Sequence, residues 1–233
     1  MYVILFSSVC LAVAAIGFIL YRQRQNTKAI QTVTERHRGT SSERELVLQL
    51  LRMGFRNTAI FHDLYIRNRN GTYTQIDLVL ATDVGILVFE VKEYSGWIFG
   101  TGTQRNWTQV MGYGRYKYPF YNPVFQNRKH VSDLRDQLPQ FRDIPFYSIV
   151  VFYGNCQFVK VKEIPFDTFL VKWHEVANVI NGIVASGKSA PYKDKWEVAH
   201  FLAAAARNGA DHQIVQEHVI NVTQWRRQFG SGG

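Results

Sequence analysis

The sequence predicts an α/β protein in which a central mixed β-sheet is flanked by helices. Strand-like runs alternate with helical patterns along the chain, which is typical of this fold class. The run Phe146–Tyr153 is almost wholly apolar, as expected for a strand covered on both faces. With 233 residues, 46% of them hydrophobic, the chain is long enough for one domain with a substantial core. Its two cysteines, Cys10 and Cys156, exclude a disulfide framework and the usual four-ligand structural zinc site.

The first 21 residues predict a membrane anchor. No charged residue occurs from Met1 to Tyr21, and Val3–Leu20 can cross a hydrocarbon core roughly 30 Å thick as a helix. Residues 22–38 hold five basic residues and one acidic residue, which predicts a basic juxtamembrane linker on the cytoplasmic side. We therefore expect a single-pass protein of a bacterial-type inner membrane with its domain in the cytoplasm. The alternative is a signal peptide that frees a secreted protein, although no basic segment precedes the apolar run.

A helix is expected to begin at residues 40–42 and to end at Gly54. Its first turn fits a capping box that includes Glu43, and glycine is a common helix stop. Glu43 also lies one turn before Leu46 and two turns before Leu50, so its side chain points toward the side that the helix buries. Two interpretations of Glu43 follow: a capping carboxylate, or a side chain that reaches a buried site.

Strands and further helices follow along the chain. Turn residues separate three strand-like runs, Ala59–Ile66, Gln75–Ala81 and Ile86–Tyr94. Asn122 and Pro123 are suited to the N-cap and first position of a helix that continues to about Leu138. After the apolar strand at residues 146–153, the pattern predicts a strand at 168–171 and helices near 175–184, 196–207 and 213–228.

The runs at 75–81 and 86–94 are expected to form a hairpin that brings two carboxylates together. If Asp83 and Val84 form a two-residue turn, Asp77 lies opposite Glu90, and Gln75 lies opposite Lys92. Alternation then places these four polar side chains on one face of the sheet, and Ile76, Leu78, Phe89 and Val91 on the other.

Carboxylates at opposed strand positions repel each other, and a divalent cation relieves the repulsion. We therefore expect Asp77 and Glu90 to bind Mg²⁺, or alternatively Mn²⁺, with Glu43 as a further metal or water ligand. Such a metal activates water and stabilises charge on a phosphate, and Lys92 is placed to orient the water or to neutralise phosphate oxygens. The alternative interpretation is an exposed strand face with ordinary salt bridges.

The stretch from Tyr94 to Ser132 holds no acidic residue and many aromatic rings. Cations that contact phosphates and rings that stack on bases together suit a single-stranded or frayed nucleic acid. The alternative is a β-rich segment whose rings form core and whose charges are solvated. The basic residues expected to bind nucleic acid are Arg105, Arg115, Lys117, Arg128 and Lys129.

These residues together resemble the NERD (nuclease-related domain) family of the PD-(D/E)XK nuclease-like superfamily over residues 39–155. The motifs that carry the resemblance are Gly39-x-x-x-Glu43, Gln75-Ile76-Asp77, Glu90-Val91-Lys92-Glu93-Tyr94, Gly96, Trp107 and Asn122-Pro123-Val124-Phe125-Gln126. The family often has a glycine directly before the glutamate, where this chain has Ser42. The resemblance implies a restriction-endonuclease-like core, with residues 156–233 as a C-terminal strand and helical extension.

By the same resemblance, Glu43, Asp77, Glu90 and Lys92 occupy the active-site positions of the superfamily, and Gln126 matches a motif glutamine. Gln126 and His130 also share one helix face, which either lines the site or is ordinary surface. We therefore expect a membrane-anchored, Mg²⁺-dependent protein that hydrolyses phosphodiester bonds in DNA, with RNA as the alternative substrate. The alternative function is a non-catalytic nucleic-acid-binding or membrane-scaffold domain that retains the fold.

Overall fold

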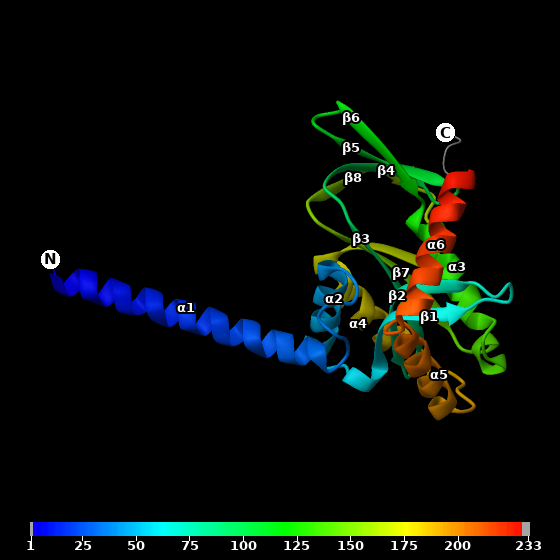
Figure 1. Cartoon of the computed structure of the whole chain (residues 1–233), viewed down its shortest axis with the longest axis horizontal. Helices are drawn as coiled ribbons and strands as arrows, with labels where there is room; N and C mark the ends of the chain where they lie inside the picture. The colour runs from blue at the N-terminus through cyan, green and yellow to red at the C-terminus, as the bar shows by residue number, and fades with distance from the viewer. Residues whose placement is uncertain (1, 230–233) are drawn as a thin grey trace.

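The computed structural model describes residues 2–229, with side chains for residue 11 and residues 13–224. It is a mixed α/β protein with two mixed sheets flanked by helices (Figure 1). The helices are α1 (Tyr2–Gln31), α2 (Ser41–Arg52), α3 (Pro123–Arg135), α4 (Val176–Ser186), α5 (Lys195–Asn208) and α6 (His212–Phe229). The strands are β1 (Ile60–Arg67), β2 (Tyr73–Thr82), β3 (Gly85–Glu93), β4 (Gly96–Thr101), β5 (Asn106–Met111), β6 (Tyr116–Tyr121), β7 (Phe146–Tyr153), β8 (Cys156–Lys162) and β9 (Thr168–Lys172).

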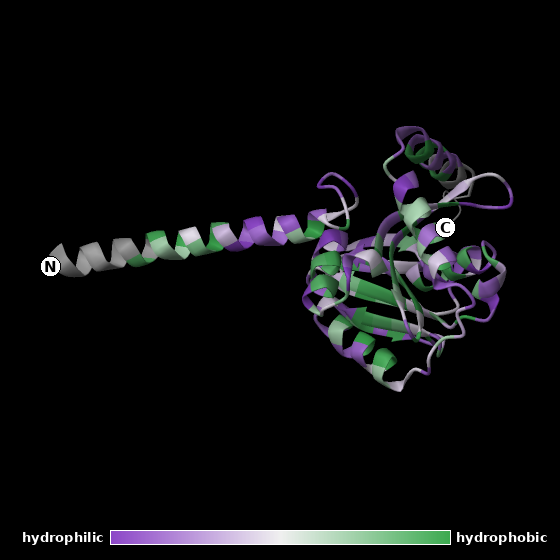
Figure 2. Ribbon diagram, turned by 90° about the horizontal axis from the view of Figure 1, so that it is seen from below, coloured by the Kyte–Doolittle hydropathy of each residue, from purple (hydrophilic) through white to green (hydrophobic). Residues whose placement is uncertain are grey.

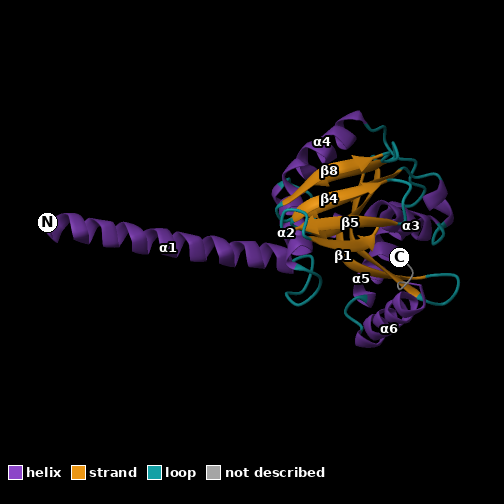
Figure 3. Cartoon of the chain, turned by 90° about the horizontal axis from the view of Figure 1, so that it is seen from above, coloured by secondary structure: helices purple, strands orange, loops and turns teal. Residues whose placement is uncertain are grey.

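The strands form two sheets where the sequence predicted one. The five-stranded sheet has the order β1-β2-β3-β7-β9, with β1, β2 and β3 antiparallel and β7 and β9 parallel to β3. The four-stranded sheet has the order β6-β5-β4-β8, and its strands lie beside one another when the molecule is seen from above (Figure 3). Strands β4, β5, β6 and β8 were not among the predicted elements. Because β8 and β9 each complete a sheet, the predicted C-terminal extension is part of the fold.

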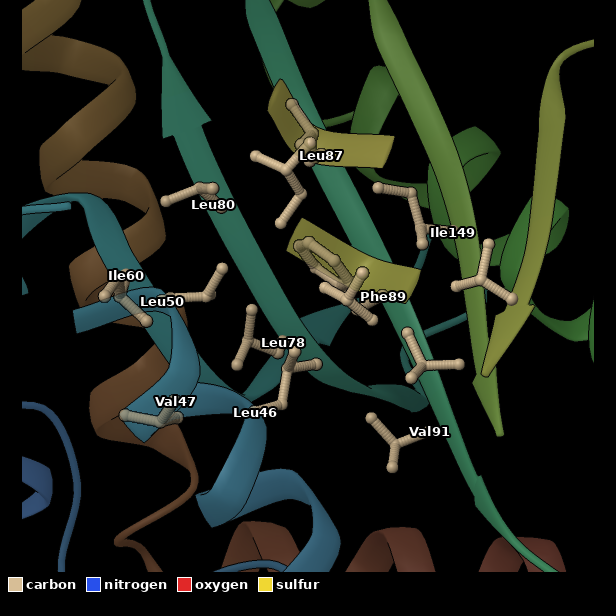
Figure 4. Packing of buried hydrophobic residues seen from close by; sticks show 14 of the residues in the cluster. Leu46, Val47, Leu50, Ile60, Leu78, Leu80, Leu87, Phe89, Val91 and Ile149 are labelled. Atoms are coloured by element: carbon tan, nitrogen blue, oxygen red, sulfur yellow. The ribbon is translucent and has the colours of Figure 1, made fainter. Parts of the chain in front are cut away.

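Helices cover both faces of the five-stranded sheet. On one face, α2 and α4 pack on β2, β3 and β7, and Leu46, Leu50 and Phe89 are fully buried there (Figure 4). On the other face, α3 and α5 pack through Leu134 and Leu202. The strands in the middle of Figure 2 are accordingly coloured as hydrophobic over most of their length. Burial of this apolar surface from water supplies the main driving force for this arrangement.

The hairpin of β2 and β3 has the predicted register. Thr82 pairs with Gly85 and Leu78 pairs with Phe89, on either side of the Asp83-Val84 turn. Within the described chain the β2–β3 ladder stops at the pair of Leu78 and Phe89, so neither predicted opposition, Asp77 with Glu90 nor Gln75 with Lys92, belongs to it.

The predicted alternation along β2 also fails at one position. Ile76 packs with the core on the α3 and α5 side, whereas Leu78 packs on the α2 and α4 side. The change of side occurs at Asp77, and the facing residue of β1, Asp63, has a left-handed backbone with φ 54°.

Helix α1 extends away from the rest of the molecule (Figures 1 and 2). It continues to Gln31, so the first part of the predicted linker is helical. Its predicted membrane-spanning part depends largely on residues 2–10 and 12, whose side chains lie outside the described ones. Among the described residues, no helix combines the length and the apolar character that crossing a membrane requires.

Candidate active site

The candidate site lies where the C-terminal end of β3 meets α3. Glu90 is buried, and its Oε1 lies 2.5 Å from Lys92 Nζ. Lys92 Nζ also donates to Gln126 Oε1 of α3, at 3.1 Å. His130 Nε2, one helical turn further along α3, lies 3.2 Å from Glu90 Oε2. The predicted pair Gln126 and His130 therefore lines the site, and both oxygens of Glu90 have a nitrogen neighbour.

Local sequence explains why α3 presents this face to β3. Asn122 caps the helix, because its side chain accepts a hydrogen bond from the Val124 N–H at 2.9 Å. One turn later, the buried Asn127 side chain donates to the Val88 carbonyl at 2.9 Å and to the Ser148 hydroxyl at 3.0 Å. A buried amide needs hydrogen-bond partners, and Asn127 finds them on two strands. Its bonds therefore join α3 to β3 and β7. The position of α3 against the sheet is thus fixed by contacts other than those of the site residues.

Asp77 reaches the same end of β3 from the neighbouring strand. Its Oδ2 accepts a hydrogen bond from the Val91 N–H at 2.7 Å, between the two site residues of β3. Burial raises the pKa of the Asp77 carboxyl well above its usual range, and the negative charges of Glu90 and Glu43 raise it further. The positive charge of Lys92 acts in the opposite direction without offsetting them. Asp77 is therefore the carboxylate in this cluster with the least compensation.

Glu90 and Lys92 form a charged pair. Burial acts to raise the pKa of Glu90, but Lys92 and His130 more than offset it, and the pKa lies below its usual value. Burial likewise acts to lower the pKa of Lys92, but Glu90 and Asp77 together raise it above its usual value. Lys92 is consequently a permanent cation and not a base at neutral pH.

Glu43 meets both interpretations given above. Its Oε1 accepts hydrogen bonds from the Thr40 N–H and hydroxyl, which completes a capping box for α2. Its Oε2 is buried and lies 3.2 Å from Nε2 of His62 on β1. Burial acts to raise the pKa of Glu43, but His62 and Thr40 outweigh it, so the pKa is lowered. The side chain is thus held ionised, close enough to Asp77 to influence it.

Gly39, the first residue of the Gly-x-x-x-Glu motif, is required by the packing around Glu43. Its φ is +64°, and a Cβ at this position would lie 2.5 Å from Glu43 Oε2 and 2.6 Å from the His62 ring. Only glycine tolerates both the left-handed backbone and this close approach. The spacing of the motif therefore places the backbone of residue 39 directly against the carboxylate of residue 43.

A second buried network beside the site was not predicted. Arg38 Nε lies 3.1 Å from Asp63 Oδ2, and its guanidinium also donates to backbone carbonyls of Asp63 and Ala206. Asp63 Oδ1 accepts from Gln75 Nε2 at 2.9 Å, so the motif glutamine binds this aspartate rather than facing Lys92. His62 and Asp63 interrupt an apolar strand run, and that interruption was the available sequence signal for this network.

The five predicted nucleic-acid-binding residues lie on different elements. Arg115 and Lys117 belong to the β5–β6 hairpin, and Arg105 precedes β5. On α3, Arg128 Nη2 lies 3.8 Å from Asp167, and Lys129 Nζ lies 2.6 Å from Asp133. The two α3 cations are therefore partly neutralised, whereas the hairpin carries no acidic residue.

The aromatic residues of the acid-free stretch divide into two groups. Trp107 is fully buried and Phe120 packs beside it, with ring centroids 6.2 Å apart. Tyr113, Tyr116 and Tyr118 are exposed. The core interpretation is correct for the first group and wrong for the second.

The carboxylates fit a Mg²⁺ ion in part. Among the described residues, no group of three or more His, Cys, Asp or Glu side chains is arranged to hold a metal. Asp77 and Glu90 provide two carboxylates, and Mg²⁺ is often held by one or two together with water and substrate phosphate. The raised pKa of Asp77 shows that the ionised form of this carboxyl is poorly compensated within the protein, and a cation at this position would stabilise that form. Glu43 faces Thr40 and His62, so its predicted role as a direct ligand is not formed in this arrangement.

Comparisons with known proteins agree with these observations. Residues 38–153 match the family described as nuclease-related domain, NERD. An uncharacterized protein of Bacillus anthracis is 29% identical over 136 residues, which cover 57% of this chain and 62% of the relative. The matched region thus spans less than two thirds of that relative's length. No solved structure matches the chain.

Proposed function

This chain is a member of the nuclease-related domain family through residues 38–153, and from this premise we propose that it hydrolyses phosphodiester bonds in DNA with the help of Mg²⁺. The observation that carries the proposal is the cluster of Asp77, Glu90 and Lys92, held by Gln126 and His130 of α3. Carboxylates and a lysine at one strand end suit reactions in which negative charge develops on a phosphate.

Asp77 and Glu90 would hold the metal, with Mn²⁺ as an alternative to Mg²⁺. The ion would supply an activated water and charge stabilisation at the phosphate. Glu43 contributes from α2 through its negative charge and, as a further proposal, through a water.

The protein side chains have separate tasks in this proposal. Lys92 stays protonated and neutralises a phosphate oxygen, since its pKa is raised by Glu90 and Asp77 despite its burial. Gln126 orients Lys92 by accepting its hydrogen bond, and His130 keeps Glu90 ionised and in place. A rigid arrangement of this kind lowers the reorganisation needed during the reaction.

We further propose that α1 anchors the protein in an inner membrane, with the domain in the cytoplasm. The support is the charge-free sequence from Met1 to Tyr21, followed by Arg22 and Arg24. Apolar side chains such as Phe18 and Leu20 are exposed on the helix. Reporter fusions at the C-terminus test the topology: a reporter active only outside the cytoplasm would refute it.

A second candidate function is nucleic-acid binding without turnover. Both oxygens of Glu90 already have cationic or imidazole neighbours, and Glu43 has His62, so most of the charge is compensated within the protein. Buried carboxylates paired in this way are also found where no chemistry takes place.

A nuclease assay on the full chain decides between these functions. Wild type should cleave DNA with Mg²⁺ or Mn²⁺ and not with EDTA, and Asp77→Asn and Lys92→Ala should be inactive. Asp143→Asn is the matched control, because Asp143 forms an exposed ion pair with Lys193, 3.1 Å away. Wild-type DNA binding without cleavage under all conditions would support the non-catalytic function instead.

A further inference from the structure

The β5–β6 hairpin is anchored at one end and exposed at the other. Trp107 and Phe120 pack into the core at its base, and Trp107 Nε1 donates to the Thr101 carbonyl at 2.9 Å. The far end projects beyond the five-stranded sheet at the top of Figure 1. There Tyr113 is 99% exposed, and Tyr116 and Tyr118 are about half exposed. The exposed rings are therefore mounted on a fixed base.

The tip of the hairpin has an unusual backbone. Gly112, Tyr113 and Gly114 are all left-handed, with φ of 60°, 56° and 98°. A bulky residue in this region is strained, and Tyr113 buries no surface that would offset the cost. The hairpin turn accounts for this backbone, because the Arg115 N–H donates to the Gly112 carbonyl at 3.2 Å and a turn of this kind needs positive φ at both central residues, Tyr113 and Gly114. The turn does not account for an aromatic residue at its first central position, where the ring is left in solvent.

The charges and spacing of the hairpin suit a single nucleic-acid strand. No acidic residue occurs from Tyr94 to Ser132. Lys117 points to the opposite face of β6 from Tyr116 and Tyr118, and because β6 is the edge strand of its sheet, a nucleic-acid strand stacked on the rings meets this cation where it passes around the edge. Tyr116 and Tyr118 lie two positions apart on β6, which corresponds to about 6.8 Å along the strand. This is about twice the 3.4 Å repeat of stacked bases, so one base fits between the two positions.

A hollow of about 440 Å³ lies beside the turn of the hairpin, between that turn and the start of β4. Trp97, Met111 and Tyr113 supply apolar walls, and Asn155 and Gln157 supply amides that can bond to a base edge. Ser95 also lines it, only three residues after Lys92, so the hollow lies within about 11 Å of that residue along the chain.

We propose that the exposed end of the β5–β6 hairpin and this hollow bind single-stranded nucleic acid, with the rings stacking on bases and Arg115 and Lys117 contacting phosphates. The proposal rests on the proposed function, since it names the substrate class that the site would receive. Duplex DNA keeps its bases stacked inside, so it would gain from the two cations and not from the rings.

Binding is measured by fluorescence anisotropy with the full chain in detergent and EDTA, using an oligo(dT) of about 15 nucleotides and a duplex of equal length. Tyr116→Ala and Tyr118→Ala should each weaken oligo(dT) binding at least about fivefold, and the Phe variants should retain it. Duplex binding should be unchanged in all four. Phe166→Ala is the matched control, because Phe166 is a fully exposed ring outside the hairpin.

The proposed phosphate contacts of Arg115 and Lys117 are tested by the salt dependence of oligo(dT) binding. Arg115→Ala and Lys117→Ala should each reduce the salt dependence of oligo(dT) binding by about 0.7 in the logarithmic slope. Unchanged slopes in both variants would contradict the phosphate contacts.

Three results would overturn the proposal. In the first, the alanine variants bind oligo(dT) as tightly as wild type, with unchanged unfolding midpoints. In the second, oligo(dT) and duplex lose affinity equally. In the third, the tyrosines are needed for binding phosphatidylserine vesicles and not oligo(dT), which would make the hairpin a membrane contact. Ring-dependent oligo(dT) binding without any cleavage in Mg²⁺ would refute only the proposed catalysis, whereas cleavage with ring-independent binding would refute only this inference.

Discussion

Replacing Asp77 by Asn is expected to remove the stabilisation of the protein by Mg²⁺. The carboxylate lies in a cluster with Glu90 and Glu43, and the charge of Lys92 and the hydrogen bond from the Val91 N–H compensate it only in part. The amide oxygen of Asn can still accept the hydrogen bond from the Val91 N–H, so the fold should survive the change. The substitution therefore removes a charge and keeps the local geometry.

The raised pKa of Asp77 predicts whether Asp77→Asn is more or less stable than wild type in the absence of metal. The folded state holds the Asp77 proton more tightly than the unfolded chain does. Stability is therefore lost as pH rises from the unfolded pKa, about 3.9, through the raised folded pKa. Asn does not titrate, so the variant in EDTA should be at least as stable as wild type at neutral pH, with the difference growing across that pH window.

The stabilisation that bound Mg²⁺ gives to the folded protein can be calculated from the ratio of the Mg²⁺ concentration to its Kd. Mg²⁺ at 100 times its Kd stabilises wild type by about 2.7 kcal/mol. For a protein of this size that corresponds to about 5–11 °C in Tm. Asp77→Asn should show little of this shift.

Thermal unfolding of the full chain during a Mg²⁺ titration measures the shift, with EDTA as the baseline and Asp143→Asn as the control. Equal shifts in wild type and Asp77→Asn would show that Mg²⁺ binds elsewhere. A destabilised Asp77→Asn, with no metal effect on either protein, would show that the carboxylate is structural.

Three further predictions concern the structure around the site. Trp107→Ala should lower the free energy of unfolding by about 3–5 kcal/mol in urea titrations, because a fully buried ring is lost; a loss below about 1 kcal/mol would contradict its core position. Gly39→Ala should lower the free energy of unfolding in urea titrations by about 1–3 kcal/mol and displace the Glu43 side chain, because φ at residue 39 is +64° and an added Cβ would lie against the Glu43 carboxylate. An unfolding free energy equal to that of wild type would show that this contact is absent. His130→Ala should raise the pKa of Glu90, because His130 helps to hold it down against burial, and carboxylate titration by NMR measures this; an unchanged pKa would place His130 outside the site.

Much of the candidate site could be predicted because it is local in sequence. The Asp83-Val84 turn joins β2 and β3 directly, so a two-residue loop sets the register and brings Asp77 to the backbone of Val91. The caps of α2 and α3 were predictable for the same reason, since each depends on residues two or three positions apart. Helix geometry then placed Glu43 on the buried side of its helix, whereas Gln126 was assigned to the site through the family resemblance.

The contacts that complete the site depend on segments far apart in the chain. His62 meets Glu43, and Gln75 turns to Asp63, only because β1 pairs with β2 and α2 packs beside them. Likewise, His130 reaches Glu90 because α3 packs across β3 and β7.

The sequence by itself determined the mixed α/β class, the β2–β3 register, the capped helices and the residue types of the site. All of these are set by propensities and periodicities within short segments. Only the tertiary structure decided that there are two sheets, that Ile76 faces the opposite side from Leu78, and that Trp107 is core whereas Tyr113 is exposed. A pattern shows that a side chain can be buried, but which surface covers it depends on long-range packing.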